Sequence, residues 1–137
     1  MRILLFCILL IGFISSCHTH YPKPKEVQKI SFEENEEGDY EIIVFDSQYE
    51  TFLLTHAMPI SYYSENYYKN QNIFLVTEWN ARHNQPNRFN RNLYEVYIDY
   101  QPHIAYGLAF EYRLYNFFMF MEWKYDIDID QRINRYR

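Results

Sequence analysis

The chain has 137 residues and carries 13 basic against 18 acidic side chains, a formal charge of −5. This length suits one globular domain rather than two. Because binding to nucleic-acid phosphates depends on clustered Lys and Arg, the acidic balance argues against a nucleic-acid partner.

The first seventeen residues have the pattern of an export signal. Arg2 supplies a positive charge, an apolar run covers Ile3–Ile14, and two serines precede Cys17. This order is typical of a secretory signal peptide, and the run is shorter than the roughly 20 residues that span a bilayer. The ending Ile14-Ser15-Ser16-Cys17 resembles the lipobox of bacterial lipoproteins, in which the cysteine is acylated and becomes the mature N-terminus. We therefore predict a signal peptide over residues 1–16 and lipidation of Cys17, which holds the chain on a membrane.

Residues 17–38 read as a polar tether. They include Pro22, Pro24 and a run of glutamates, a composition that disfavours a packed core. No acidic run follows the cysteine directly, so we expect an outer-membrane anchor with the domain facing the periplasm. The mature chain has no cysteine besides Cys17, so packing and not a disulfide must stabilise its single domain, expected over residues 39–125.

The first half of this domain predicts a strand and two helices. Asp39–Asp46 is rich in β-branched and aromatic residues, which favours a buried strand. Ser47 and Glu50 have the spacing of a capping box, so a helix should start at Ser47 and end before Pro59. A second helix is expected over residues 65–83, after a cap at Ser61 or Ser64, and a loop over residues 84–92.

The second half predicts one more strand and a central helix. Apolar and polar residues alternate over Tyr94–Tyr100, which is typical of a strand. After Pro102, a helix should cover residues 103–124 with apolar side chains on most of its sides, as in a buried helix. Glu111 and Arg113 interrupt it, which favours a core helix over a membrane span. Residues 126–137 are expected to be a short tail.

These elements predict an α+β fold. A small sheet of two or three short strands, built from the segments near Ile43 and Val96, should pack on about three helices. An all-α bundle is the alternative if the second of these segments joins a helix.

Several motifs resemble an uncharacterised family of small Bacteroidota envelope lipoproteins, a domain of unknown function. They are Tyr40–Asp46, Val76-Thr77-Glu78-Trp79-Asn80 with Arg82, Ile98-Asp99-Tyr100 and Tyr106-Gly107. The resemblance implies one compact domain in the cell envelope, and it carries over no catalytic residue.

Tyrosines suggest a binding surface. Tyr62, Tyr63, Tyr67 and Tyr68 lie before and along the second predicted helix. Rigid aromatic rings with polar tips are enriched where proteins meet their ligands, so these rings could bind a partner protein or an envelope glycan. The alternative is a rim that seals the core.

A second candidate site surrounds Trp79. Glu78, Asn80 and Arg82 could line a polar cleft around the indole, and Trp79 could join Tyr62, Tyr63 and Tyr67 in one contact surface. The alternative is an exposed ion pair between Glu78 and Arg82, which are four apart on a helix.

The sequence contains no complete motif for binding a metal ion or a phosphate-bearing cofactor. Asp126, Asp128 and Asp130 begin like a calcium loop, but Gln131 and Arg137 stand where that loop needs glycine and glutamate. No spacing of a zinc helix motif and no phosphate-binding glycine loop occurs, so we expect no metal and no cofactor.

Two functions remain open. The first is a non-enzymatic envelope lipoprotein that binds a partner protein or glycan. The second is a small envelope hydrolase that uses Glu78 and another carboxylate such as Glu111, because paired carboxylates can perform acid–base catalysis.

Overall fold

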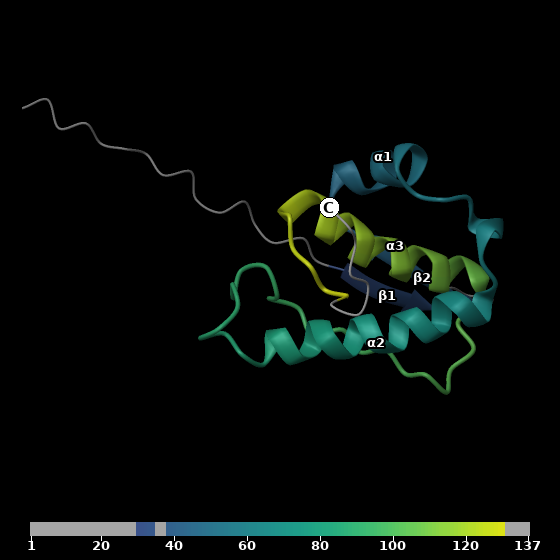
Figure 1. The fold of residues 1–137 in the computed structure, drawn as a ribbon. Coiled ribbons are helices and arrows are strands. Elements are labelled where there is room, and N and C mark those ends of the chain that lie inside the picture. The colour runs from purple at the N-terminus through teal and green to yellow at the C-terminus, as the bar shows by residue number, and fades with distance from the viewer. Residues whose placement is uncertain (1–29, 35–37, 131–137) are drawn as a thin grey trace, which may run out of the picture.

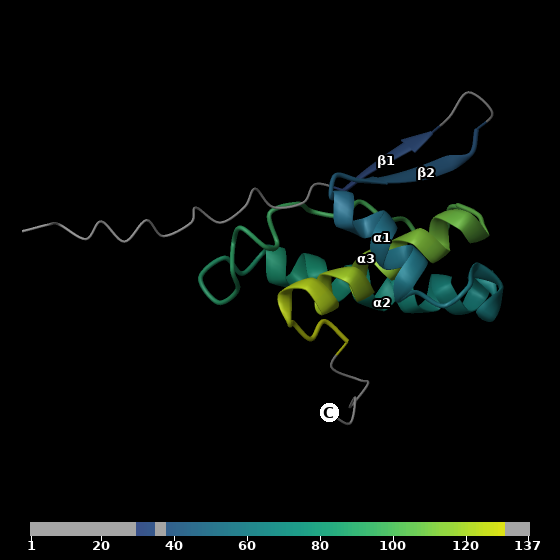
Figure 2. The same cartoon turned by 90° about the horizontal axis from the view of Figure 1, so that it is seen from above.

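The computed structural model describes residues 30–34 and 38–130. In chain order its elements are the strands β1 (Ile30–Glu34) and β2 (Tyr40–Val44), the helix α1 (Ser47–Thr55), the short 3-10 helix η1 (Ile60–Tyr62), and the helices α2 (Glu65–His83) and α3 (Leu108–Tyr125). Figures 1 and 2 show the strand pair beside the three helices. The predicted α+β class is confirmed. The predicted signal peptide and Cys17 lie outside the described residues.

The sheet is a two-stranded antiparallel hairpin. Ile30 pairs with Val44 and Glu34 with Tyr40. Its inner face is apolar, since Ile42 is 1% and Ile30 8% exposed. The strand expected within Asp39–Asp46 is confirmed, but its partner β1 lies in the segment predicted to be a tether. The prediction of a polar tether is therefore wrong for residues 30–34, because alternate residues of a strand can face a core even in a polar segment.

The segment Tyr94–Tyr100, predicted to be a strand, consists of bends and irregular backbone. Its alternation reflects burial all the same, because Ile98 and Tyr100 are buried while Tyr97 and Asp99 are exposed. The partner of Ile98 is a side chain: the Asn80 amide donates to the Ile98 carbonyl at 2.9 Å and accepts from the Ile98 N–H at 2.9 Å. One amide group thus replaces the neighbouring strand that the pattern predicts.

Helix α1 begins at Ser47, as predicted, but the residue before it provides the cap. Asp46, not Ser47, is the N-cap, and its Oδ1 accepts from the Gln48 N–H at 2.9 Å. A carboxylate in this position satisfies a free N–H and interacts well with the helix dipole. The same carboxylate forms an ion pair with Lys124, which ties the start of α1 to the end of α3.

Helix α2 has the predicted bounds, residues 65–83, and Ser64 is its N-cap. Helix α3 starts five residues later than the predicted residue 103. The residue before it, Gly107, has φ +86°, a conformation that interrupts any helix from residue 103. At the other end, Asp126 adopts a left-handed conformation and stops the helix.

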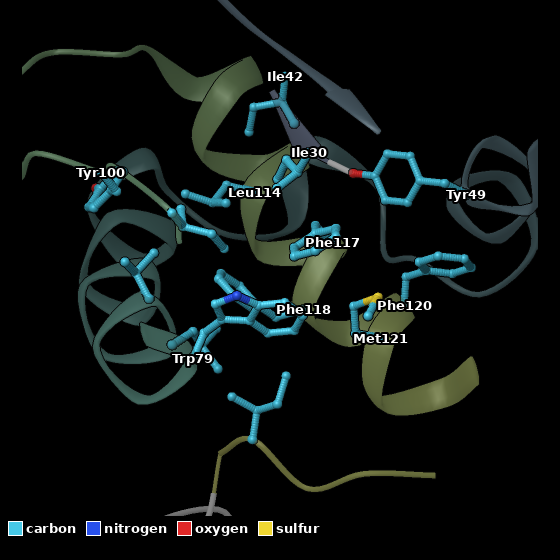
Figure 3. Packing of buried hydrophobic residues seen from close by; sticks show 14 of the residues in the cluster. Ile30, Ile42, Tyr49, Trp79, Tyr100, Leu114, Phe117, Phe118, Phe120 and Met121 are labelled. Atoms are coloured by element: carbon cyan, nitrogen blue, oxygen red, sulfur yellow. The ribbon is translucent and has the colours of Figure 1, made fainter. Parts of the chain in front are cut away.

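Helix α3 is central, as predicted. It lies between α1, α2 and the hairpin in both views (Figures 1 and 2). Six of its apolar side chains are at most 1% exposed: Phe110, Leu114, Phe117, Phe118, Phe120 and Met121. Figure 3 labels the last five of these in the packed core. No helix in the described part of the chain is apolar over enough of its length to cross a membrane.

The residues after α3 also belong to the domain. Ile129 is fully buried, and one carboxylate oxygen of Glu122 accepts from the N–H groups of Ile129 and Asp130 at 2.9 and 3.1 Å. The predicted tail therefore does not begin at residue 126, because the turn at Asp126 returns the chain to the core.

Candidate functional site

The structure divides the candidate residues between two regions of α2. Tyr62, Tyr63 and Tyr67 lie at its start, whereas Glu78, Trp79, Asn80 and Arg82 lie in its last two turns. The side chains of the second region bond mainly to other parts of the domain.

Trp79 belongs to the core. Its side chain is 1% exposed, and its indole N–H donates to the Val96 carbonyl at 2.8 Å. Its ring packs edge-on against Tyr94 and Phe117, with centroids 4.8 and 5.4 Å away. Trp79 therefore cannot share a contact surface with the tyrosines, and the prediction that it does is wrong.

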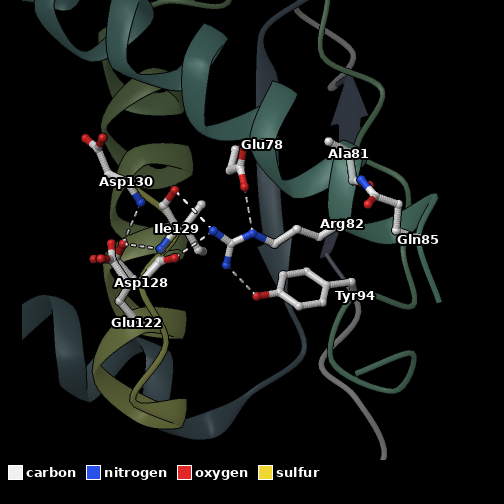
Figure 4. A network of polar contacts seen from close by, with 9 residues as sticks. All are labelled: Glu78, Ala81, Arg82, Gln85, Tyr94, Glu122, Asp128, Ile129 and Asp130. Atoms are coloured by element: carbon white, nitrogen blue, oxygen red, sulfur yellow. Dashed lines mark hydrogen bonds and ion pairs between the residues drawn. The ribbon is translucent and has the colours of Figure 1, made fainter. Parts of the chain in front are cut away.

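Arg82 is the centre of a buried polar network (Figure 4). Its Nε donates to Glu78 and its Nη1 to the Tyr94 hydroxyl, both at 2.9 Å, and its Nη2 donates to the Asp128 carbonyl at 2.7 Å. Since Arg82 is only 5% exposed, these bonds are largely shielded from water. The ion pair between Glu78 and Arg82 forms, but it is not the exposed pair that the spacing predicts, because Arg82 is buried. The Arg82 guanidinium instead clamps the 126–130 segment onto α2.

Asn80 borders a groove on this side of α2. The groove has a volume of about 390 Å³ and lies between α2 and the 97–102 segment, with apolar walls formed in part by Ile73, Val76 and Tyr97. The Asn80 amide is hydrogen-bonded to the backbone of Ile98, and the Thr77 hydroxyl donates to the Ile73 carbonyl. Both side chains therefore maintain the local backbone.

Glu111 lies in a different network from Glu78. It is 1% exposed, and its carboxylate accepts from the Asn72 amide at 2.7 Å and from the Tyr100 hydroxyl at 2.9 Å. Burial raises the pKa of Glu111, and it also raises the pKa of Tyr100. Asn72 and Glu78 are six residues apart on α2, a rise of about 9 Å along the helix axis. The contacts thus place the two carboxylates of the hydrolase hypothesis in separate hydrogen-bond networks.

The tyrosines at the start of α2 form a partly exposed cluster. Tyr62 is 57% exposed, and its ring meets Tyr63 edge-on at 4.6 Å. Tyr63 and Tyr67 stack at 3.9 Å with 18° between their planes. Tyr68 lies beneath them, 1% exposed, and burial raises the pKa of both Tyr67 and Tyr68. The hydroxyls of Tyr67 and Tyr68 are therefore neutral hydrogen-bonding groups at physiological pH.

The base of this cluster is fixed to α3. Tyr68 contacts the rings of Tyr112 and Tyr115 on that helix, and Tyr67 also contacts Tyr115. The Tyr112 hydroxyl donates to the Met58 carbonyl at 2.9 Å. Residues 62, 63 and 67 are thus brought together as predicted, on a scaffold that holds their rings in place. We call Tyr62, Tyr63 and Tyr67 the tyrosine surface.

Exposed aliphatic residues near this surface were not predicted. Leu54 is 87%, Met58 55% and Ile60 40% exposed. A sequence signal for them exists: no Asp, Glu, Lys or Arg occurs from Thr51 to Ser64, in a chain in which 23% of the residues are charged. Charged residues are depleted at the centre of interfaces, where the surface is desolvated on binding. The uncharged stretch from Thr51 to Ser64 therefore marks a surface segment that can be desolvated at low cost.

No three His, Cys, Asp or Glu side chains gather as a possible metal site in residues 30–34 and 38–130. Asp130, the last of the three aspartates that begin like a calcium loop, is buried at 3% exposure.

Comparison with known proteins identifies a family and no closer relative. The model of a family of unknown function, DUF6146, matches residues 3–134, nearly the whole chain. No curated protein and no solved structure shows significant similarity to it.

Proposed function

Because the chain belongs to the DUF6146 family, whose function is unknown, we propose its role from its own geometry: it is a non-enzymatic, lipid-anchored envelope protein that binds a partner protein through the tyrosine surface. The anchor is the acylated Cys17, and the domain faces the periplasm. The observation that carries the binding role is the stacked pair of Tyr63 and Tyr67 beside the exposed Tyr62.

The packing favours a protein partner over a glycan. Tyr63 and Tyr67 cover one face of each other's ring, so the pair offers few flat faces for a sugar to stack on. Their edges and hydroxyls remain, next to the exposed ring of Tyr62. Rigid aromatic side chains with polar tips are typical anchors of protein interfaces.

The binding test is crosslinking in intact envelopes followed by recovery of the protein. We expect the double variant Tyr63→Ser with Tyr67→Ser to lose its crosslinked partner. The matched control is Tyr97→Ser, because Tyr97 is 56% exposed but lies at the groove near Asn80. Unchanged recovery from the double variant would contradict the proposed surface. Its melting temperature shows whether a loss reflects unfolding instead.

The anchor is tested separately by intact-mass analysis and membrane fractionation. We expect the mass of two or more acyl chains on Cys17, since each buried methylene contributes about 0.8 kcal/mol and two chains hold a protein stably on a membrane. Cys17→Ser should leave the protein unprocessed or soluble. A mature protein without acyl mass would refute the anchor and leave the binding test unaffected.

A further inference from the structure

We propose that the outer side of the α1–η1 segment rests on the surface of the lipid bilayer that holds the anchor. This inference rests on the proposed lipidation of Cys17 and adds an orientation to it. The contact face consists of five exposed large apolar side chains, Phe45, Leu54, Met58, Ile60 and Trp123, and we call it the apolar face.

Exposed apolar side chains are concentrated in this part of the domain. Eight large ones are exposed among the described residues. Four members of the apolar face lie within residues 45–60, and the fifth, Trp123, contacts the His56 ring at 4.8 Å and the Phe52 ring at 5.6 Å. Of the other three, Tyr62 belongs to the adjoining tyrosine surface. Only Ile73 and Tyr97 lie elsewhere, at the groove beside Asn80.

Contact with lipid costs little desolvation on this side of the molecule. No acidic or basic residue occurs from Thr51 to Ser64. Of the two charged groups just before this stretch, Asp46 is buried in its pair with Lys124. Glu50 pairs with Arg113 but its side chain is 63% exposed, so its carboxylate stays at the level of the headgroups. Trp123 is 51% exposed at one border of the face, and tryptophan is the residue enriched where proteins meet the headgroup region of a bilayer.

The attachment point of the anchor favours lipid as the occupant. Ile30 pairs with Val44, so the chain that leads from Cys17 joins the domain beside Phe45 and the start of α1. Figures 1 and 2 show the start of β1 close to the start of α1. Cys17 precedes Ile30 by 13 residues, which span at most about 45 Å. The bilayer is thus always within reach, and contact within one tethered molecule needs only weak intrinsic affinity.

The two tryptophans of the chain make the proposal measurable. Trp79 is buried and Trp123 borders the apolar face. The full lipidated chain is reconstituted into phosphatidylethanolamine–phosphatidylglycerol vesicles whose acyl chains are brominated, because bromine quenches only nearby indoles. The Trp123 signal is the difference between the chain and its Trp123→Phe variant. We expect brominated lipid to reduce that signal at least about twofold, as for an indole at headgroup depth.

Paired variants separate the contact from the anchor. Leu54→Glu with Met58→Glu should restore the Trp123 signal although the chain stays in the vesicles. The control is Ile73→Glu with Tyr97→Glu, which charges the two exposed apolar residues elsewhere and should leave the quenching unchanged. Acylated chain without quenching would overturn the bilayer contact alone. Chain without acyl mass would overturn the anchor together with the contact. If the Trp123 indole were shielded from aqueous iodide but not quenched by brominated lipid, a protein would cover the apolar face. That result would overturn the proposal.

Discussion

Helices α1 and α2 cover the same central helix in different ways. Helix α2 has 19 residues, of which six are buried. Three of these six side chains donate hydrogen bonds inside the domain, namely Asn72, Trp79 and Arg82. Helix α1 has nine residues, buries only Tyr49 and Phe52, and exposes Leu54 almost fully. The polar side chains around Trp79, which look functional in the sequence, therefore maintain the fold, whereas the less conspicuous α1 exposes an apolar side chain.

The largest effect should come from the core that both helices cover. Phe117 on α3 is fully buried and packs against Trp79 and Phe118. We expect Phe117→Ala to lower the free energy of unfolding by about 3–5 kcal/mol, as truncation of a buried aromatic ring does. Urea unfolding measures this change. A loss under about 1 kcal/mol would contradict the central position of α3.

The next effect tests the α2 side of the comparison. Arg82→Ala removes the donor that holds Glu78, Tyr94 and the Asp128 carbonyl, and we expect a loss of about 2–3 kcal/mol, in the range of hydrogen bonds to charged groups. Hydrogen exchange at the Ile129 amide should accelerate with it. Arg88→Ala is the matched control, because Arg88 is exposed and stacks only on the neighbouring Phe89 ring. Equal losses in both variants would refute the clamp.

A smaller effect concerns the acid buried between α2 and α3. Because burial raises the pKa of Glu111, the folded state favours its neutral form. That contribution to stability is fully present below the pKa of the unfolded chain and is lost as the pH rises through the raised folded pKa. We expect Glu111→Gln to flatten this decline in stability between pH 4 and pH 8. The measurement is the urea unfolding midpoint, recorded at steps of about one pH unit. A variant whose stability falls with pH as steeply as that of the parent chain would contradict the assignment.

The smallest effect should appear on α1. Leu54→Ala changes a side chain that is 87% exposed, so we expect its free energy of unfolding to stay within about 0.5 kcal/mol of the parent value. Leu75→Ala on α2 is the matched substitution at a fully buried leucine and should cost about 2–5 kcal/mol. Similar unfolding midpoints for the two variants would erase the contrast between the helices.

The sequence predicts the helices of this fold better than its sheet. Helical periodicity extends over many residues, and it located α2 and the central α3. The strand β1 is only five residues long and contains two exposed glutamates, so its pattern is indistinguishable from a tether. Residues 94–100 do alternate in burial, but no sequence pattern shows that Ile98 pairs with the Asn80 amide instead of with a strand.

The candidate site was predictable only in part, for a physical reason. Residue type identifies groups that can bind, but tertiary packing decides whether they remain available. Tyr62 and Tyr63 precede α2 and stay at the surface, whereas Trp79 faces α3 and is enclosed. The exposed aliphatic side chains near Met58 were detectable through the missing charges, a negative signal that motif reading overlooks.

The register of the hairpin has a mechanical consequence. Ile30 and Val44 form the pair at the end where the chain leaves β1 toward Cys17 and leaves β2 toward α1. A pull on the protein through its N-terminal segment therefore loads the strand pair from that end, so that its hydrogen bonds open one after another like a zipper and do not resist together in shear. The first side chain withdrawn from the core is Ile30, and the three helices keep their contacts while β1 peels away. Under tension, the hairpin would act as an extensible link between the helical body and the anchor proposed at Cys17.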